Sequence, residues 1–379
     1  MVSAALVAAL VGYGSTIALV LAAAAAVSAT PAQTASWVLA ICLTKAAGSA
    51  FLSLYTRIPM VLAWSTPGSA LIAATSGITM AQAVGAFVLA GLLIALTGAL
   101  RPLERAISLI PDGIAAGMLA GVLLPFCLKG AAAAQIMGLA ALPMIAVFAL
   151  VRLKNPALAV LAALATGLAT AYLTGSATLP ALTLPWPQLT FIPPEFRAGT
   201  VLGLALPLSL VTMASQNLPG FATLRAAGYT PPVRLALTTT GTISALAGLF
   251  GAHTVSMAAI TAAICLGDDV HPDRNQRWKV GLAYAAVWLT LGLLSPMIIG
   301  GLQALPAGIM TLLVALALLA PLTGALTGAT ATAPTRFAAI ITLAVTASGT
   351  SAFGIGPAFW GLIAGLTLHA LDGLAKPKA

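Results

Sequence analysis

The sequence of 379 residues is poor in charge: Asp, Glu, Lys and Arg make up 6% of it, against about a quarter in a typical soluble protein. Hydrophobic residues make up 60%, and the mean hydropathy is +1.08. This composition is typical of a polytopic membrane protein. The net charge of +9 does not indicate nucleic-acid binding, because the Lys and Arg residues are scattered singly between apolar runs.

The sequence also lacks the motifs that ATP-driven pumps and intramembrane enzymes need. It has no P-loop, no Gly-rich dinucleotide pattern, no Gly-x-Ser-x-Gly and no His-Glu-x-x-His. No Asp or Glu lies in the middle of an apolar run, so a sodium or metal site built from carboxylates is disfavoured. We therefore expect no enzyme activity, no cofactor and no metal.

Two groups of residues resemble metal ligands by type but have a plainer interpretation. The cysteines lie within or beside apolar runs and lack metal-ligand spacing, so we interpret them as core residues. An acidic cluster with one His lies among basic residues, which indicates a solvated, charge-balanced loop. The cysteines are Cys42, Cys127 and Cys265, and the cluster is Asp268, Asp269, His271 and Asp273.

Apolar runs bounded by Pro, Gly or charge predict about fourteen membrane segments. With a cytoplasmic N-terminus, thirteen Lys and Arg lie in inner loops and the tail, and two in outer loops, so we expect both termini in the cytoplasm. The expected segments are 3–27, 33–54, 61–75, 81–100, 111–129, 134–152, 156–174, 199–221, 234–251, 253–266, 278–299, 304–324, 335–350 and 354–373.

The third and tenth segments are short and occupy matching positions in two halves of seven. Thr30-Pro31 corresponds to Thr230-Pro231, and Pro111-x-Gly113-Ile114 to Pro306-x-Gly308-Ile309. An odd number of segments per half makes the halves inverted, which is typical of a secondary transporter with its site at the midplane. We expect a first repeat at 1–174, an outer linker at 175–198 and a second repeat at 199–379.

The third segment is interrupted at Trp64-Ser65-Thr66-Pro67-Gly68. Pro67 predicts a short helix that begins near it after a few extended residues. Non-helical backbone at membrane depth is tolerated only where it is buried inside the protein or lines a cavity. The N–H groups of Ser69 and its neighbours, freed by the break, would form an anion site. A Pro-kinked helix or a re-entrant loop without a ligand is the alternative.

The tenth segment is interrupted near Gly251 to Thr261, where Thr254 or Ser256 is the expected N-cap. Half-helices from inverted repeats point two positive dipole ends at one space, so an anionic group is expected there. We expect the substrate contacts among Tyr13, Ser15, Trp64, Ser65, Thr66, Gly68, Ser69, Gln216, Asn217, Phe221, Thr254, Ser256 and Met257.

Polar residues in the apolar runs leave several roles open. Gln216 and Asn217 can hydrogen-bond a carboxylate, or they can join neighbouring helices. His253 is the side chain near the expected site that can exchange a proton near neutral pH, or it is a satisfied buried imidazole. Lys45 is expected to reach an interface or to bond a neighbouring helix, with a functional role as the alternative.

Three stretches resemble the benzoate/proton symporter family (BenE): Ala63–Ala70, Met213–Gly220 with Arg225–Pro232, and His253–Ile264. The resemblance implies benzoate uptake with protons across a bacterial inner membrane, on a fold shared in outline with uracil permeases and anion exchangers. It implies a core domain at about 1–100 and 199–300 and a gate domain at about 101–174 and 301–373. It also implies short antiparallel strands near Leu62-Ala63-Trp64 and His253-Thr254-Val255.

The expected partners are therefore a small aromatic carboxylate, protons and the lipid bilayer, with a homodimer as the assembly to test. A uniporter or exchanger of another small organic anion, an anion channel and a membrane scaffold that transports nothing remain as alternatives.

Overall fold

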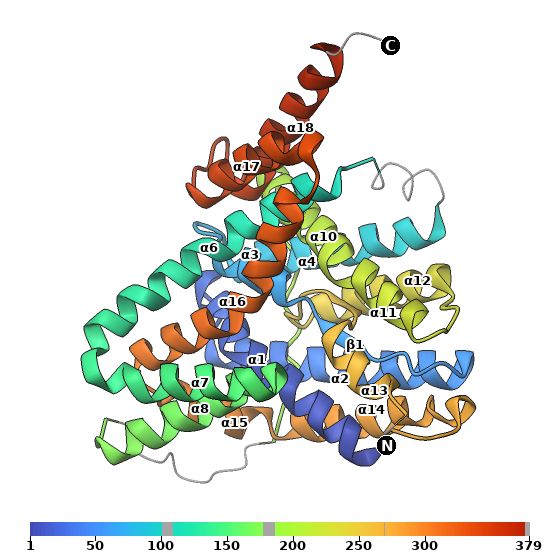
Figure 1. Ribbon diagram of the computed structural model, residues 1–379, viewed down its shortest axis with the longest axis vertical. Coiled ribbons are helices and arrows are strands. Elements are labelled where there is room, and N and C mark those ends of the chain that lie inside the picture. Colours follow the sequence, from blue (N-terminus) through green and yellow to red (C-terminus); the bar gives the residue numbers. More distant parts are fainter. Residues whose placement is uncertain (101–108, 177–185, 269, 376–379) are drawn as a thin grey trace.

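The computed structural model describes residues 1–100, 109–176, 186–268 and 270–375. These residues form many apolar helices and one two-stranded sheet at the centre (Figure 1). Some residues on which the sequence predictions rest lie outside the described ranges. They are 101–108 of the gate domain, 177–185 of the linker, Asp269, Lys376 and Lys378.

The first half of the chain contains the elements α1 (Val2–Ala26), α2 (Pro31–Thr56), β1 (Leu62–Trp64), α3 (Thr66–Ala73), α4 (Met80–Ala99), α6 (Asp112–Met137), α7 (Leu142–Lys154) and α8 (Pro156–Leu173). The second half contains α9 (Ala198–Thr200), α10 (Leu206–Thr212), α11 (Leu218–Ala226), α12 (Val233–Gly248), β2 (Val255–Met257), α13 (Ile260–Leu266), α14 (Lys279–Leu293), α15 (Ser295–Gln303), α16 (Ala307–Ala331), α17 (Ala333–Ala347) and α18 (Pro357–Ala375).

Helix packing follows the predicted inverted repeat. α2 packs along α14, and the matching pair α12 and α4 packs in the same way. α7 packs on α8 as α17 packs on α18, and the long helices α6 and α16, which match each other, lie together. Both long helices start directly after the prolines of the repeated motif, Pro111 and Pro306. The two halves are therefore interleaved, since the extensively packed pairs α2 with α14, α12 with α4 and α6 with α16 each take one helix from each half.

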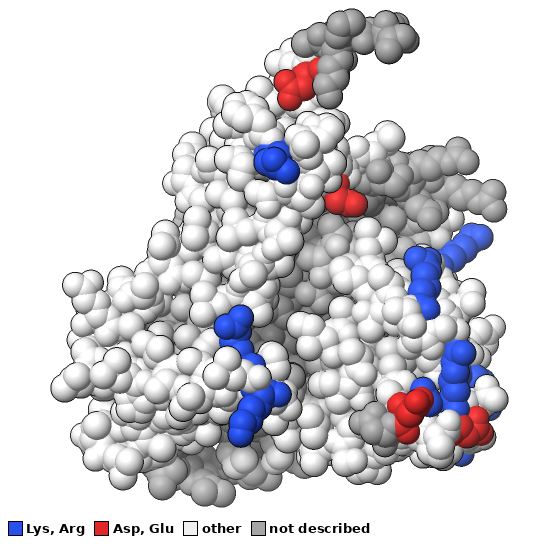
Figure 2. Space-filling view, viewed as in Figure 1, with Lys and Arg blue, Asp and Glu red and all other residues white. Residues whose placement is uncertain are grey.

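Glycines let paired helices approach closely. At Gly91 of α4 and Gly241 of α12, an added Cβ would meet backbone atoms of the partner helix at Ala245 and Ala95 respectively. Association of apolar helices in a membrane depends on such small residues, because lipid offers the helices no hydrophobic drive to associate. Figure 2 shows one face of the whole molecule, which is largely uncharged and has a hollow near its middle.

The number of membrane segments stays a prediction. In the described ranges, six helices are long and apolar enough to cross a membrane, or seven if one bent pair is counted as one span. That pair is α14 and α15, which differ in direction by 57° and cover the segment expected at 278–299. Pro296 explains the bend, because it has no N–H to donate to the carbonyl of Gly292, four residues earlier, so α14 cannot continue straight through it.

Our prediction of the boundary between the fifth and sixth segments was wrong. We expected a break between 129 and 134, but α6 continues through Gly130 and ends at Met137. Gly130 allows α6 to approach α16, where an added Cβ would clash with Ala315. The chain turns instead at Gly138, whose φ of +58° favours glycine.

Candidate functional site

The two broken segments meet in an antiparallel sheet. Its register pairs Leu62 with Met257, Ala63 with Ser256 and Trp64 with Val255. β1 lies where the family resemblance placed it, whereas β2 begins at Val255, two residues later than expected. The later start of β2 has a local cause. Gly251 has φ +91° and makes a turn, and the chain joins the strand pairing only after that turn.

The helix after β1 begins as Pro67 predicted. α3 starts at Thr66, and the hydroxyl of its N-cap residue Ser65 accepts the N–H of Gly68 at 3.1 Å. The N–H of Ser69 donates to the Ser65 carbonyl at 2.8 Å, so the expected anion contact from Ser69 is corrected. The N–H of Thr66 is the first-turn donor with no acceptor among the described residues.

The helix after β2 differs from our expectation. Ser256 lies inside the strand, and α13 starts at Ile260 without a side-chain cap, so neither Thr254 nor Ser256 is its N-cap. The hydroxyl of Thr254 instead lies 2.9 Å from that of Thr212, which donates to Ser65 at 2.9 Å. This chain of hydroxyl groups joins the two broken segments to α10.

His253 is completely buried and both of its ring nitrogens are bonded. The indole N–H of Trp37 donates to Nδ1 at 2.9 Å, and Nε2 lies 2.8 Å from the hydroxyl of Ser69. Tryptophan can only donate, so Nδ1 accepts and the ring proton lies on Nε2. Ser69 in turn donates to the Ser65 carbonyl. The geometry favours the structural alternative for His253, and a role in proton transfer stays a prediction.

Gln216 and Asn217 are neighbours with different surroundings. Both lie in a π-helical turn, Met213–Asn217, of the kind often found at functional sites. Asn217 is completely buried, and its side-chain oxygen accepts the N–H of Met257 in β2 at 2.9 Å. Gln216 faces a cavity and has no hydrogen-bond partner among the residues described.

A cavity of about 800 Å³ lies beside the crossing of the two broken segments. Four of the expected substrate contacts line it: Ser15, Trp64, Thr66 and Gln216. Its lining is mostly apolar, with a small set of polar groups. The expected contacts that do not line it are Tyr13, Ser65, Gly68, Ser69, Asn217, Phe221, Thr254, Ser256 and Met257, and the proton candidate His253 does not line it either.

Lys45 of α2, for which a functional role was the alternative to a structural one, lies at the cavity. It is fully buried and lines the cavity, and its Nζ has no hydrogen-bond partner within the described chain. The Nζ lies 3.0 Å from the ring centre of Trp288 and 4.6 Å from that of Trp64. The signal in the sequence was a single lysine inside an apolar run, which by default marks a functional site.

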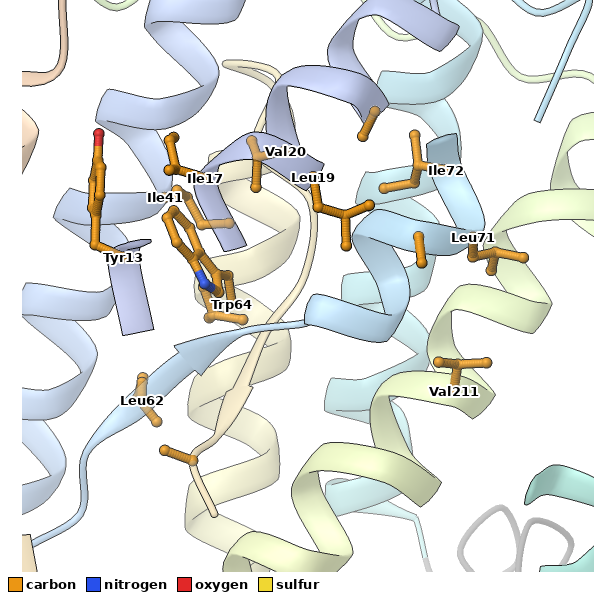
Figure 3. Close-up of a cluster of buried hydrophobic side chains, with 14 of the residues drawn as sticks. Tyr13, Ile17, Leu19, Val20, Ile41, Leu62, Trp64, Leu71, Ile72 and Val211 are labelled. Carbon is orange, nitrogen blue, oxygen red and sulfur yellow. The ribbon is translucent and has the colours of Figure 1, made fainter. Parts of the chain in front are cut away.

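Aromatic rings hold Lys45 in place. The ring centres of Trp64 and Trp288 are 5.3 Å apart, and Tyr13 packs on both at 5.5 and 5.8 Å. Figure 3 shows the Trp64 ring pointing from β1 toward α1, beside Tyr13. The hydroxyl of Tyr284 donates to the Leu62 carbonyl at 2.9 Å and so fixes α14 against β1. The lysine therefore lies against packed aromatic rings at the wall of the cavity.

The arrangement suits a small molecule with an apolar body and one anionic end. Lys45 and the free N–H of Thr66 can meet a carboxylate, and the amide of Gln216 and the hydroxyl of Ser15 can orient it. The apolar remainder of the lining can cover a ring, as in most small-molecule sites.

Comparisons with known proteins identify the family of the chain. The model of the family described as benzoate membrane transport protein (BenE) matches residues 1–371. The inner membrane protein YdcO of Escherichia coli (strain K12) is 39% identical over 357 residues, which are 94% of this chain and 91% of that protein. The benzoate membrane transport protein of Acinetobacter baylyi (strain ATCC 33305 / BD413 / ADP1) is 32% identical over 345 residues, 91% of this chain and 87% of that protein.

A solved structure supports the fold. The chain is similar to the transmembrane domain of a cyanobacterium bicarbonate transporter, BicA, with a TM-score of 0.57 and 14% identity, over 96% of this chain and 97% of that one. At this identity the likeness concerns the fold alone. It confirms the predicted class of fold, a polytopic helical membrane protein built as an inverted repeat.

Proposed function

The chain belongs to the benzoate membrane transport protein family, and from this premise we propose that it is a secondary active transporter that imports benzoate, or a similar aromatic carboxylate, together with protons. The proposal places it in the inner membrane of a bacterium with both termini in the cytoplasm. The observation that carries it is the cavity whose lining includes both the buried Lys45, whose Nζ has no hydrogen-bond partner among the described residues, and Thr66 at the N-terminus of α3.

Charge decides how the substrate is oriented. A carboxylate is ionised at neutral pH, as those of Asp and Glu are. In the proposed pose it approaches Nζ of Lys45 and the N–H of Thr66, where a positive dipole end and a positive side chain add. The aromatic ring extends into the apolar part of the cavity, where Trp64 supplies one face.

The position of the cavity supports alternating access. Its lining includes Lys45, Thr66 and Gln216 from the proposed core domain, and Val160 and Pro321 from the proposed gate domain. Movement of the core against the gate would therefore open the same binding residues first to one side of the membrane and then to the other.

Uptake of labelled benzoate into proteoliposomes tests the proposal. We expect saturable uptake that accumulates when the outside is more acidic than the lumen, and proton entry that accompanies it. Uptake that is independent of the proton gradient would reject symport in favour of a uniporter or exchanger. Benzoate currents too large for alternating access would identify an anion channel, and the absence of saturable uptake would indicate a scaffold.

A further inference from the structure

We propose that the ε-amine of Lys45 binds the transported proton together with the substrate carboxylate, so that one side chain couples the two. This inference rests on the proposed function and deepens it, since it names the group on which symport depends.

The surroundings of Lys45 provide the first reason. An ammonium at this position has exchanged its water shell for the faces of Trp64 and Trp288, with no anion and no hydrogen-bond acceptor among the described residues. Ring faces attract a cation but do not replace a counterion. A carboxylate in the cavity supplies that counterion. The proton on Lys45 and the bound carboxylate therefore strengthen each other's binding, by the same factor in both directions.

The other candidates for the proton provide the second reason. Both nitrogens of His253 are occupied by Trp37 and Ser69, so a second ring proton would remove the bond from Trp37. Asp112 is the acidic residue of the described cavity lining, and its side chain is exposed at the start of α6. The titratable groups around Lys45 are Cys42 on α2, Tyr13 on α1, Cys265 on α13, Tyr284 on α14 and His253 before β2, with Asp112 across the cavity on α6.

The cycle balances in protons and charge. On the outer side the neutral amine forms one N–H bond with a proton while the carboxylate binds beside it. The pair of ammonium and carboxylate is neutral overall and crosses with the core domain. On the inner side the carboxylate leaves, the N–H bond breaks, and the neutral amine returns. No electron is transferred, and one proton accompanies each carboxylate.

Substitution by arginine separates charge from proton exchange. Arg keeps its charge at every accessible pH. The Lys45→Arg variant therefore still offers the carboxylate a positive charge, but it cannot release a proton. In proteoliposomes we expect the Lys45→Arg variant to keep benzoate counterflow. The level of benzoate that it accumulates under a pH gradient should fall at least tenfold. Lys129→Arg is the matched control, because Lys129 is exposed on α6 and does not line the cavity. It should accumulate benzoate as the unsubstituted protein does.

Calorimetry on the purified full-length protein gives a second measurement that does not depend on the arginine fitting against the aromatic rings. Benzoate is titrated at neutral pH in two buffers with different ionisation enthalpies. We expect about one proton to be taken up per benzoate bound by the unsubstituted protein. The variant Lys45→Met, which is of similar length and uncharged, should take up none in whatever benzoate binding it retains.

The outcomes distinguish the two proposals. If the unsubstituted protein transports no benzoate, the proposed function fails, and this inference fails with it. If it transports benzoate with protons but Lys45→Arg accumulates as the control does, or Lys45→Met still takes up a proton on binding, this inference is overturned and the function stands. If Lys45→Arg does not fold, calorimetry on the unsubstituted protein decides: binding without proton uptake refutes the assignment.

Discussion

Alanine substitutions at two adjacent residues, Gln216 and Asn217, should affect different properties: the first benzoate affinity, the second stability. Gln216→Ala removes an amide that faces the cavity without a protein partner, whereas Asn217→Ala removes the acceptor of the Met257 N–H in β2. A hydrogen bond to a charged group contributes about 1.5–3 kcal/mol, so Gln216→Ala should weaken benzoate binding roughly 10- to 150-fold. An orphaned, fully buried N–H costs about 1–3 kcal/mol, so Asn217→Ala should lower the free energy of unfolding by that amount.

Two readings on detergent-purified protein separate these effects. The apparent Tm without ligand reports stability, and the dependence of Tm on benzoate concentration reports affinity, because a ligand of the native state raises its apparent stability. We expect Gln216→Ala to leave the ligand-free Tm unchanged and to weaken the response to benzoate. Asn217→Ala should lower the ligand-free Tm while its affinity changes less than about threefold, well below the loss of a charged hydrogen bond.

Each variant is the control for the other, since both remove a polar amide from the same π-helical turn. If Asn217→Ala keeps the original Tm and loses affinity as Gln216→Ala does, Asn217 contacts the substrate and our interpretation of the turn is wrong.

Three further predictions test the surroundings of the site. His253→Gln should keep accumulation driven by a pH gradient but lower the Tm, since the imidazole bonds Trp37 and Ser69; lost accumulation with preserved counterflow would make His253 the proton carrier. Ser65→Ala removes the N-cap of α3 and should cost about 0.5–2 kcal/mol in thermal unfolding, whereas Ser65→Thr, which keeps the hydroxyl, should cost less. Gly241→Ala should lower the Tm through a clash worth about 1–3 kcal/mol, while Gly300→Ala, where an added Cβ meets no atom within 4 Å, should not.

The sequence predicted the features that depend on local chemistry. Pro67 placed the start of α3 within one residue, because the missing N–H and the restriction on the preceding residue act within a single turn. The repeated Pro111 and Pro306 predicted matching helix starts for the same reason. The inverted repeat followed from the order of these local signals along the chain.

Features that depend on tertiary packing could not be predicted in the same way. Gln216 and Asn217 have similar chemistry, and the π-helical turn that points one at the cavity and the other at β2 leaves no pattern in the sequence. The sequence left three roles open for Lys45: reaching an interface, bonding a neighbouring helix, or a function. Its burial depends on Trp288, which lies 243 positions further along the chain and becomes its neighbour only when α14 packs on α2.

The pairing of β1 with β2 makes each half of the chain incomplete without the other. A half-length protein with only one repeat would leave the polar backbone of its strand unpaired at membrane depth, where each unsatisfied group costs several kcal/mol. The second half supplies the missing partner strand, and α14 and α12 of that half pack on α2 and α4 of the first. Each half therefore depends on the other both for the partner of its strand and for the packing of its helices.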